Sequence, residues 1–239
     1  MMLEALIFDL DGTLADTEET HRQAFNAAFM KFELGWDWDP RRYAQLLRIS
    51  GGKERLVHYV ETLGLAPNER ARILELVPAL HRTKTRIYTE LLEQGRRPFR
   101  PGVAKLLQAA SDAGLKLAIA STTTSANIDA LLRANLGQAP HPAFSVIACG
   151  DQVRAKKPAP DIYNLALASL RLSAPQCIAF EDSVNGLRSA RAAGLVTVVT
   201  PSRWNADEDF SDADRVLESL EDIDLPALGR LLGEARAET

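Results

Sequence analysis

The fold is decided by residues 3–13, which read LEALIFDLDGT. The first six of these residues form a short apolar run that breaks at Asp9, Asp11 and Gly12, a pattern typical of a buried strand followed by a polar turn. Glycine allows the backbone to turn sharply at this point. The two carboxylates therefore stand together at the end of a strand, where they would repel each other without a cation.

Four later apolar runs repeat this pattern. They span residues 115–120, 144–149, 177–180 and 195–200. Helical patterns fill the intervals, at residues 103–113, 126–136, 161–170 and 184–193. Strands that alternate with helices, and that are apolar along their whole length, predict an α/β fold with a doubly wound parallel sheet covered on both faces.

The interval after the first strand does not follow this alternation. Residues 16–97 carry only helical periodicity, and glycine and proline cluster where the chain returns, between residues 93 and 102. We therefore expect a helical domain at 16–97, inserted into a core formed by residues 1–15 and 98–239. Its first helix is expected to open at Asp16, with Glu19 completing a capping box.

Composition and charge exclude several classes of protein. The chain has 28 lysines and arginines against 32 acidic residues, a formal net charge of −4, so we expect neither a nucleic-acid nor a membrane partner. No apolar stretch approaches the ~18 residues that a membrane span requires, and no signal peptide is expected. Cys149 and Cys177 are isolated in apolar runs, which favours a reducing compartment. We expect a cytoplasmic monomer.

Ligands of a doubly wound sheet bind beyond the carboxyl ends of its strands. Glu181 and Asp182 end the fourth run, and with Asp9 they would form an all-oxygen site of the kind that Mg²⁺ prefers. Lys157 would add a fixed positive charge, and Ser121 a hydroxyl group. These groups favour phosphoryl transfer, in which one carboxylate forms an aspartyl phosphate and a second acts as acid and then as base.

Four motifs in this order resemble those of the haloacid dehalogenase superfamily, and the resemblance covers essentially the whole chain. Residues 9–14, DLDGTL, look like its first motif. Ser121 corresponds to the second, Lys157 before Pro158 to the third, and residues 181–183, EDS, to the fourth.

This resemblance implies a sheet with strand order 5-4-1-2-3 and a small helical cap at the insertion. It also implies that Asp9 is the nucleophile and Asp11 the acid and base. Mg²⁺ would be held by Asp9, the carbonyl oxygen of Asp11 and Asp182, with Glu181 nearby. True dehalogenases resemble this pattern but lack the second aspartate of the first motif, so that activity is disfavoured.

Within the superfamily, the insertion is similar to that of the CbbY-like sugar-bisphosphate phosphatases. Three strings carry the similarity: residues 15–22, ADTEETHR, residues 51–55, GGKER, and residues 81–85, HRTKT. The resemblance implies xylulose 1,5-bisphosphate as substrate. β-Phosphoglucomutases and phosphoglycolate phosphatases have related caps.

Several residues are candidates for substrate binding. Glu18 and His21 lie three apart on the buried stripe of the first helix of the insertion, so we expect them to contact substrate hydroxyl groups or, alternatively, to support the cap at its hinge. Thr122, beside Ser121, is a further candidate. Tyr43 lines the cleft or packs in the core of the insertion.

A second phosphate of the substrate has its own candidate site. Residues 50–53, SGGK, lack the Walker pattern, but Gly52 at a helix start offers free N–H groups, and Lys53 and Arg55 add charge. A solvated, capped helix is the alternative. Arg82 and Lys84 are candidates for the same task, or else surface charges.

The function expected from these observations is a Mg²⁺-dependent hydrolase, a phosphatase of a small sugar bisphosphate. A β-phosphoglucomutase-type mutase, which returns the phosphoryl group to the sugar, is the first alternative. A phosphosugar sensor without turnover is the second, although the pair Asp9 and Asp11 argues against it, because a sensor needs no acid and base.

Overall fold

The computed structural model describes residues 2–95, 97–137, 143–221 and 223–237. In this part of the chain, a parallel six-stranded sheet has the order β3-β2-β1-β4-β5-β6. Its strands are β1 (Ala5–Phe8), β2 (Lys116–Ala120), β3 (Phe144–Ala148), β4 (Cys177–Glu181), β5 (Val196–Val199) and β6 (Arg215–Val216). The expected doubly wound α/β fold and the order of its first five strands are confirmed, and the short β6 extends the sheet beyond β5.

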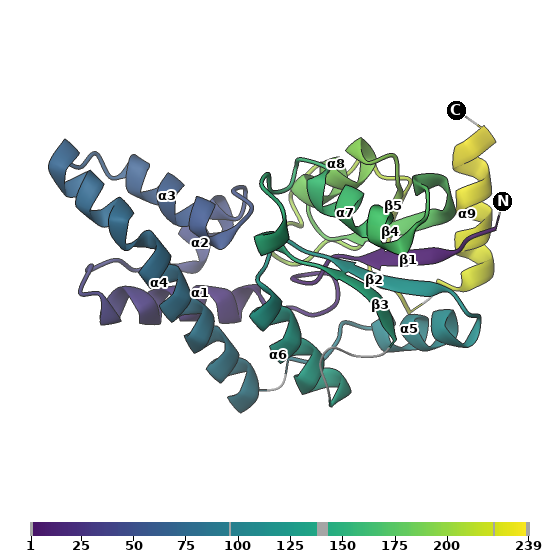
Figure 1. Cartoon of the computed structure of the whole chain (residues 1–239), viewed down its shortest axis with the longest axis horizontal. Coiled ribbons are helices and arrows are strands. Elements are labelled where there is room, and N and C mark those ends of the chain that lie inside the picture. Colours follow the sequence, from purple (N-terminus) through teal and green to yellow (C-terminus); the bar gives the residue numbers. More distant parts are fainter. Residues whose placement is uncertain (1, 96, 138–142, 222, 238–239) are drawn as a thin grey trace.

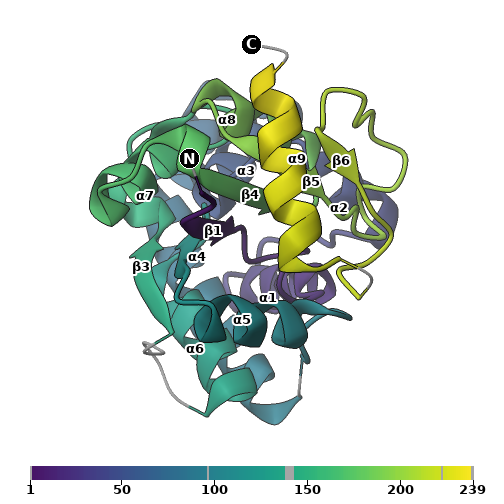
Figure 2. The ribbon, with the colours of Figure 1, turned by 90° about the vertical axis from the view of Figure 1, so that its right-hand side faces the viewer.

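Helices cover both faces of the sheet (Figure 2). They are α5 (Val103–Asp112), α6 (Ser125–Leu136), α7 (Asp161–Leu170), α8 (Val184–Ala192) and α9 (Leu225–Ala237). Alternate residues of β1 point to opposite faces: Leu6 and Phe8 pack with α5, α6 and α9, whereas Ala5 and Ile7 pack with α7 and α8. Burial on both faces explains why the strands have no polar alternation in the sequence.

Four helices between β1 and β2 stand beyond the sheet (Figure 1). They are α1 (Glu18–Lys31), α2 (Pro40–Leu46), α3 (Gly52–Thr62) and α4 (Pro67–Gln94), and together they are called the cap below. The cap has its own aromatic core, in which Trp38 contacts Phe25, Phe29, Tyr43 and Tyr59. None of the described helices combines the length and hydropathy needed to cross a bilayer.

The two chain segments that connect the cap to the sheet lie side by side. Ala15 forms an antiparallel bridge with Phe99, and Arg100 N donates to Leu14 O at 2.8 Å. The Arg100 side chain donates to the carbonyl groups of Gly12, Thr200 and Pro201. Because both connections meet here, we propose residues 16 and 97 as the limits of the cap.

The first cap helix begins two residues later than expected. Helix α1 starts at Glu18, and Thr17 precedes it without capping it through its side chain. The expected capping box is wrong, because Glu19 instead accepts hydrogen bonds from Arg22. The Thr17 hydroxyl donates to Asp11 at 2.5 Å, so this helix end is used to hold a carboxylate of the pocket.

Candidate active site

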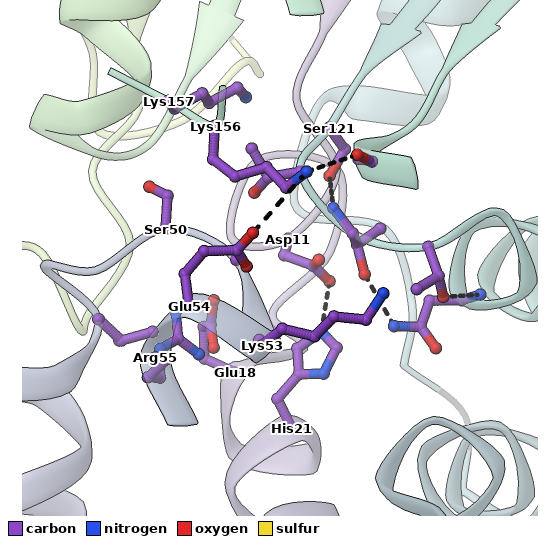
Figure 3. A pocket seen from close by; sticks show the side chains of 18 of the residues that line it. Asp11, Glu18, His21, Ser50, Lys53, Glu54, Arg55, Ser121, Lys156 and Lys157 are labelled. Atoms are coloured by element: carbon purple, nitrogen blue, oxygen red, sulfur yellow. Dashed lines mark hydrogen bonds and ion pairs between the residues drawn. The ribbon is translucent and has the colours of Figure 1, made fainter. Parts of the chain in front are cut away.

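A pocket lies between the carboxyl ends of the strands and the cap (Figure 3). The sheet side contributes Asp9, Asp11, Ser121, Thr122, Lys157 and Asp182. The cap contributes Glu18, His21, Gly52, Lys53, Arg55, His81 and Lys84. Residues from distant parts of the sequence therefore meet at the edge of the sheet that the strand pattern indicates.

The register of β1 and β4 brings two carboxylates to one lysine. Phe8 pairs with Phe180, so Asp9 and Glu181 follow at the same level of the sheet. Lys157 Nζ lies 2.6 Å from Asp9 Oδ1 and 2.6 Å from Glu181 Oε1. All three side chains are buried. The pKa of Lys157 is raised above its usual value, because the attraction of both carboxylates outweighs the effect of burial.

One ammonium group does not neutralise the buried acids. Oxygen atoms of Asp9, Glu181 and Asp182 lie within 4.8 Å of one another. Burial raises the pKa of Asp9 to about 7, although Lys157 opposes this shift. Burial and the two neighbouring carboxylates raise the pKa of Asp182 well above its usual value. Since Glu181 Oε2 is also buried without a hydrogen-bond partner among the described residues, this oxygen-rich cluster fits a Mg²⁺ ion.

Asn205 completes the surroundings of Asp182. Its Nδ2 atom donates to Asp182 Oδ2 at 2.8 Å, and the side chain is buried. Asn205 lies in the irregular segment after β5. This segment carries no motif or periodicity from which the role of Asn205 could be predicted.

The second carboxylate of the first motif faces the cap. Asp11 Oδ1 accepts hydrogen bonds from Thr17 Oγ1 and lies 3.0 Å from His21 Nε2. Burial alone would raise the pKa of Asp11, but the contacts with His21 and Thr17, together with the charge of Lys84, lower it to about 2. Asp11 is therefore a carboxylate at neutral pH.

Lys84 controls the tautomer of the histidine that contacts Asp11. Lys84 Nζ lies 2.5 Å from His21 Nδ1. An ammonium group has donors only, so a charged Lys84 makes Nδ1 the acceptor and leaves the proton on Nε2, which then donates to Asp11. The His21 ring stacks on Tyr88, with centroids 4.0 Å apart, which fixes the ring plane.

The burial of Lys84 is expected to make the stability of the folded protein increase with pH. Burial lowers its pKa from 10.5 to about 7, so between these values the unfolded chain binds more protons than the folded one. We expect Lys84→Met to increase the free energy of unfolding near pH 7. The difference in this free energy between the variant and the wild type should become smaller toward ~pH 9. Urea denaturation checks this, with the exposed Lys105→Met as control. A difference that does not change with pH would contradict it.

Two candidates from the sequence do not line the pocket. Tyr43 is fully buried in the cap, and its hydroxyl donates to Glu18. Arg82 is exposed on α4, whereas Lys84 is buried and lines the pocket. Positions two apart on a helix face different directions, so only one of these two cations can reach the cleft.

His81 lines the pocket, but the sequence did not single it out as a candidate. It lies three residues before Lys84 on the same face of α4, and Gly52 leaves the space that its ring occupies. Burial and the nearby cation Lys84 lower the pKa of His81 to about 3. The three-residue spacing between His81 and Lys84 predicts that both lie on one face of a helix, and this could have identified His81 as a candidate.

The other candidates from the sequence line the same pocket. Ser121 is buried at the end of β2, and its Oγ accepts from Thr123 N at 3.3 Å. Thr122 is half-buried beside it. Gly52 opens α3, and Lys53 is exposed at its first turn, 3.7 Å from Asp151 of the sheet side. These residues surround the space between the acids and the cap.

Comparisons with known proteins give independent evidence on the family and the fold. A family model described as haloacid dehalogenase-like hydrolase matches residues 3–194. The "Protein CbbY, plasmid" of Cupriavidus necator is 50% identical over 220 residues, which is 92% of this chain and 87% of that protein. The "Protein CbbY" of Rhodobacter capsulatus is 51% identical over 214 residues, which is 90% of this chain and 92% of that protein.

Solved structures extend the similarity. CbbY from Rhodobacter sphaeroides in complex with phosphate has a TM-score of 0.83 and 45% identity, and the match covers 92% of this chain and 96% of that one. A mutant of the same protein in complex with xylulose 1,5-bisphosphate has a TM-score of 0.83 and 44% identity, with the same coverage.

Proposed function

Because this chain belongs to the haloacid dehalogenase-like hydrolase family, and is a phosphatase, we propose that it is a Mg²⁺-dependent phosphatase of a small sugar bisphosphate, with xylulose 1,5-bisphosphate as substrate. The observation that carries the proposal is the pair Asp9 and Asp11 at the floor of the pocket, one paired with Lys157 and the other with His21 of the cap. The CbbY complex with that sugar supports the choice of substrate.

Asp9 is the nucleophile of the proposed reaction. Its oxygen forms a bond to phosphorus while the bond from phosphorus to the sugar oxygen breaks, which gives an aspartyl phosphate that water then hydrolyses. Lys157 favours the ionised form of Asp9, against the effect of burial, and orients its carboxylate. Asp9, Glu181, Asp182 and the Asp11 carbonyl oxygen would hold Mg²⁺, which when bound offsets the negative charge of the acids and the phosphoryl group.

Asp11 moves the protons in this proposal. It gives a proton to the departing sugar oxygen and later takes one from the attacking water. As Asp11 starts as a carboxylate, it must first gain a proton. An anionic phosphoryl group beside it raises its pKa. Nε2 of His21 is the nearest donor, and Lys84 Nζ passes a proton to Nδ1 as Nε2 releases its own, so that the imidazole stays neutral.

The cap holds the second phosphate in this proposal. Lys84 has no carboxylate within 4.0 Å among the described residues. Its buried ammonium group therefore has no counterion from this part of the chain and can pair with a phosphate. Gly52 and Lys53 present N–H groups at the start of α3, and Arg55 adds positive charge. Since all of these groups come from one chain, we propose that the enzyme acts as a monomer.

A phosphate-release screen tests the proposed function. We expect release from xylulose 1,5-bisphosphate in preference to ribulose 1,5-bisphosphate, β-glucose 1-phosphate, fructose bisphosphate and phosphoglycolate, and we expect EDTA to abolish it. An isomeric sugar phosphate formed without free phosphate would indicate a mutase instead. No release from any of these compounds would indicate a sensor.

A further inference from the structure

A buried chain of hydrogen bonds runs through the cap to Glu18. Arg55 Nη1 donates to the Tyr43 hydroxyl at 3.1 Å, and this hydroxyl donates to Glu18 Oε2 at 2.7 Å. Glu18 and Arg55 line the cap side of the pocket (Figure 3), whereas Tyr43 is completely buried behind them. The three residues come from α1, α2 and α3, so the chain joins three cap helices at the pocket wall.

The direction of these hydrogen bonds is fixed by chemistry. An arginine only donates, so the Tyr43 oxygen must accept from Arg55. Burial and the neighbouring Glu18 raise the pKa of Tyr43 well above its usual value, so its hydroxyl keeps the proton and points it at Glu18. Glu18 is therefore held as an acceptor through Oε2. Among the described residues, no other side chain donates to this carboxylate, which leaves Oε1 for a ligand.

The chain is anchored at its Arg55 end and at Tyr43. Arg55 Nε donates to the carbonyl groups of Leu46 and Ile49, at 3.1 and 3.3 Å, so the guanidinium cannot turn freely into the pocket. The Tyr43 ring packs edge-on against Trp204 of the sheet side, with centroids 5.6 Å apart. The position of the Glu18 carboxylate is thus set by groups outside the pocket.

We propose that Tyr43 and Arg55 are positioning residues that hold Glu18 as the acceptor for a sugar hydroxyl group, and thereby make the enzyme selective for hydroxylated phosphate esters. The proposal rests on the proposed function. It assigns Tyr43 and Arg55 a role through Glu18, in addition to any charge that Arg55 offers the substrate. A contact to a substrate hydroxyl is present before and during the reaction, so its loss raises KM more than it lowers kcat.

Tyr43→Phe tests this role, because it removes only the hydroxyl group. We expect KM for xylulose 1,5-bisphosphate to rise roughly tenfold, as for the loss of a hydrogen bond to a charged group, with kcat changed by less than about threefold. Activity on p-nitrophenyl phosphate, whose leaving group carries no sugar hydroxyl, should stay within about twofold. Tyr59→Phe is the matched control, since Tyr59 is buried in the same aromatic core but lies outside the chain to Glu18.

The outcomes separate this inference from the proposed function. An unchanged KM for the sugar, or an equal loss on both substrates, would overturn the positioning role. Wild-type protein that hydrolyses p-nitrophenyl phosphate but no sugar phosphate would overturn the proposed substrate class and this role together. Wild-type protein active on xylulose 1,5-bisphosphate keeps the proposed function whatever Tyr43→Phe does.

Two further variants test the route through Glu18. In a Glu18→Gln background, Tyr43→Phe should change KM for the sugar by less than about twofold, because its effect depends on the carboxylate. Additive losses would overturn the proposal. If Tyr43→Phe does not fold, Arg55→Lys gives the same readout: it keeps the charge but loses the fork that reaches both Tyr43 and the carbonyl groups. KM for the sugar should rise in the wild-type background but change by less than about twofold in a Glu18→Gln background. An equal rise in both backgrounds would contradict the role, because Arg55 would then act on the substrate without Glu18.

Discussion

Asp9→Asn is expected to lower kcat by roughly 10⁴-fold or more, the scale seen when a nucleophile is removed from an enzyme. An amide oxygen is a poor nucleophile and cannot form the acyl phosphate. The substitution should not harm the fold, since burial already raises the pKa of Asp9 to about 7 and a neutral amide relieves the crowding of carboxylates around Lys157. We expect the free energy of unfolding to be unchanged or higher.

Phosphate release and urea denaturation of Asp9→Asn should be measured on the same preparation. Asp112→Asn, which changes an exposed aspartate on α5, controls for the change of charge. Mg²⁺-dependent turnover that stays within about a hundredfold of wild type would exclude Asp9 as the nucleophile. A large loss of stability would contradict the expected effect on the fold and would show that the charge of Asp9 is needed for folding.

The fold was predictable because its strands are buried on both faces. Continuous apolar runs with intervening helices predict a parallel sheet covered on both faces. The order of five strands, which the structure confirms, came from the family resemblance. The sixth strand was not predictable, because Arg215 and Val216 are exposed and two residues carry no periodicity. Its pairing with Val198 and Val199 is a property of the sheet edge rather than of the local sequence.

The sheet side of the pocket was predictable for a related reason. Parallel strands end at the same edge, so Asp9 and Asp182, which follow the adjacent strands β1 and β4, were expected to meet once the sheet was inferred. Lys157 lies in the loop well beyond the end of β3, and only its match to the third motif of the family indicated its place. No comparable rule predicts which side chains of the cap face the pocket. Which of Arg82 and Lys84 enters the cleft depends on the rotation of α4, and whether Tyr43 lines the pocket or stands behind Glu18 depends on how α1 and α2 pack.

Lys157→Met is the second change with a large expected effect, because Lys157 is the only side chain in the described part of the chain that forms ion pairs with Asp9 and Glu181. Its removal leaves buried carboxylates unpaired, which costs about 3–5 kcal/mol in comparable cases. We expect the free energy of unfolding, measured in urea with EDTA present, to fall by that amount, and phosphate release to be lost. Lys105→Met on the exposed face of α5 is the control.

A double variant separates the two roles of Lys157. Adding Glu181→Gln to Lys157→Met removes one of the uncompensated charges, while Tyr163, which donates to Glu181 at 2.5 Å, retains an oxygen acceptor in the amide. We expect most of the lost stability to return without any return of activity, because Asp9 still lacks the ammonium group that orients it and the proposed Mg²⁺ site has lost the charge of Glu181. If stability does not recover, packing of the lysine side chain rather than its charge holds this part of the pocket together. If activity recovers with stability, Lys157 acts on the fold alone, and the buried carboxylates carry out the chemistry without it.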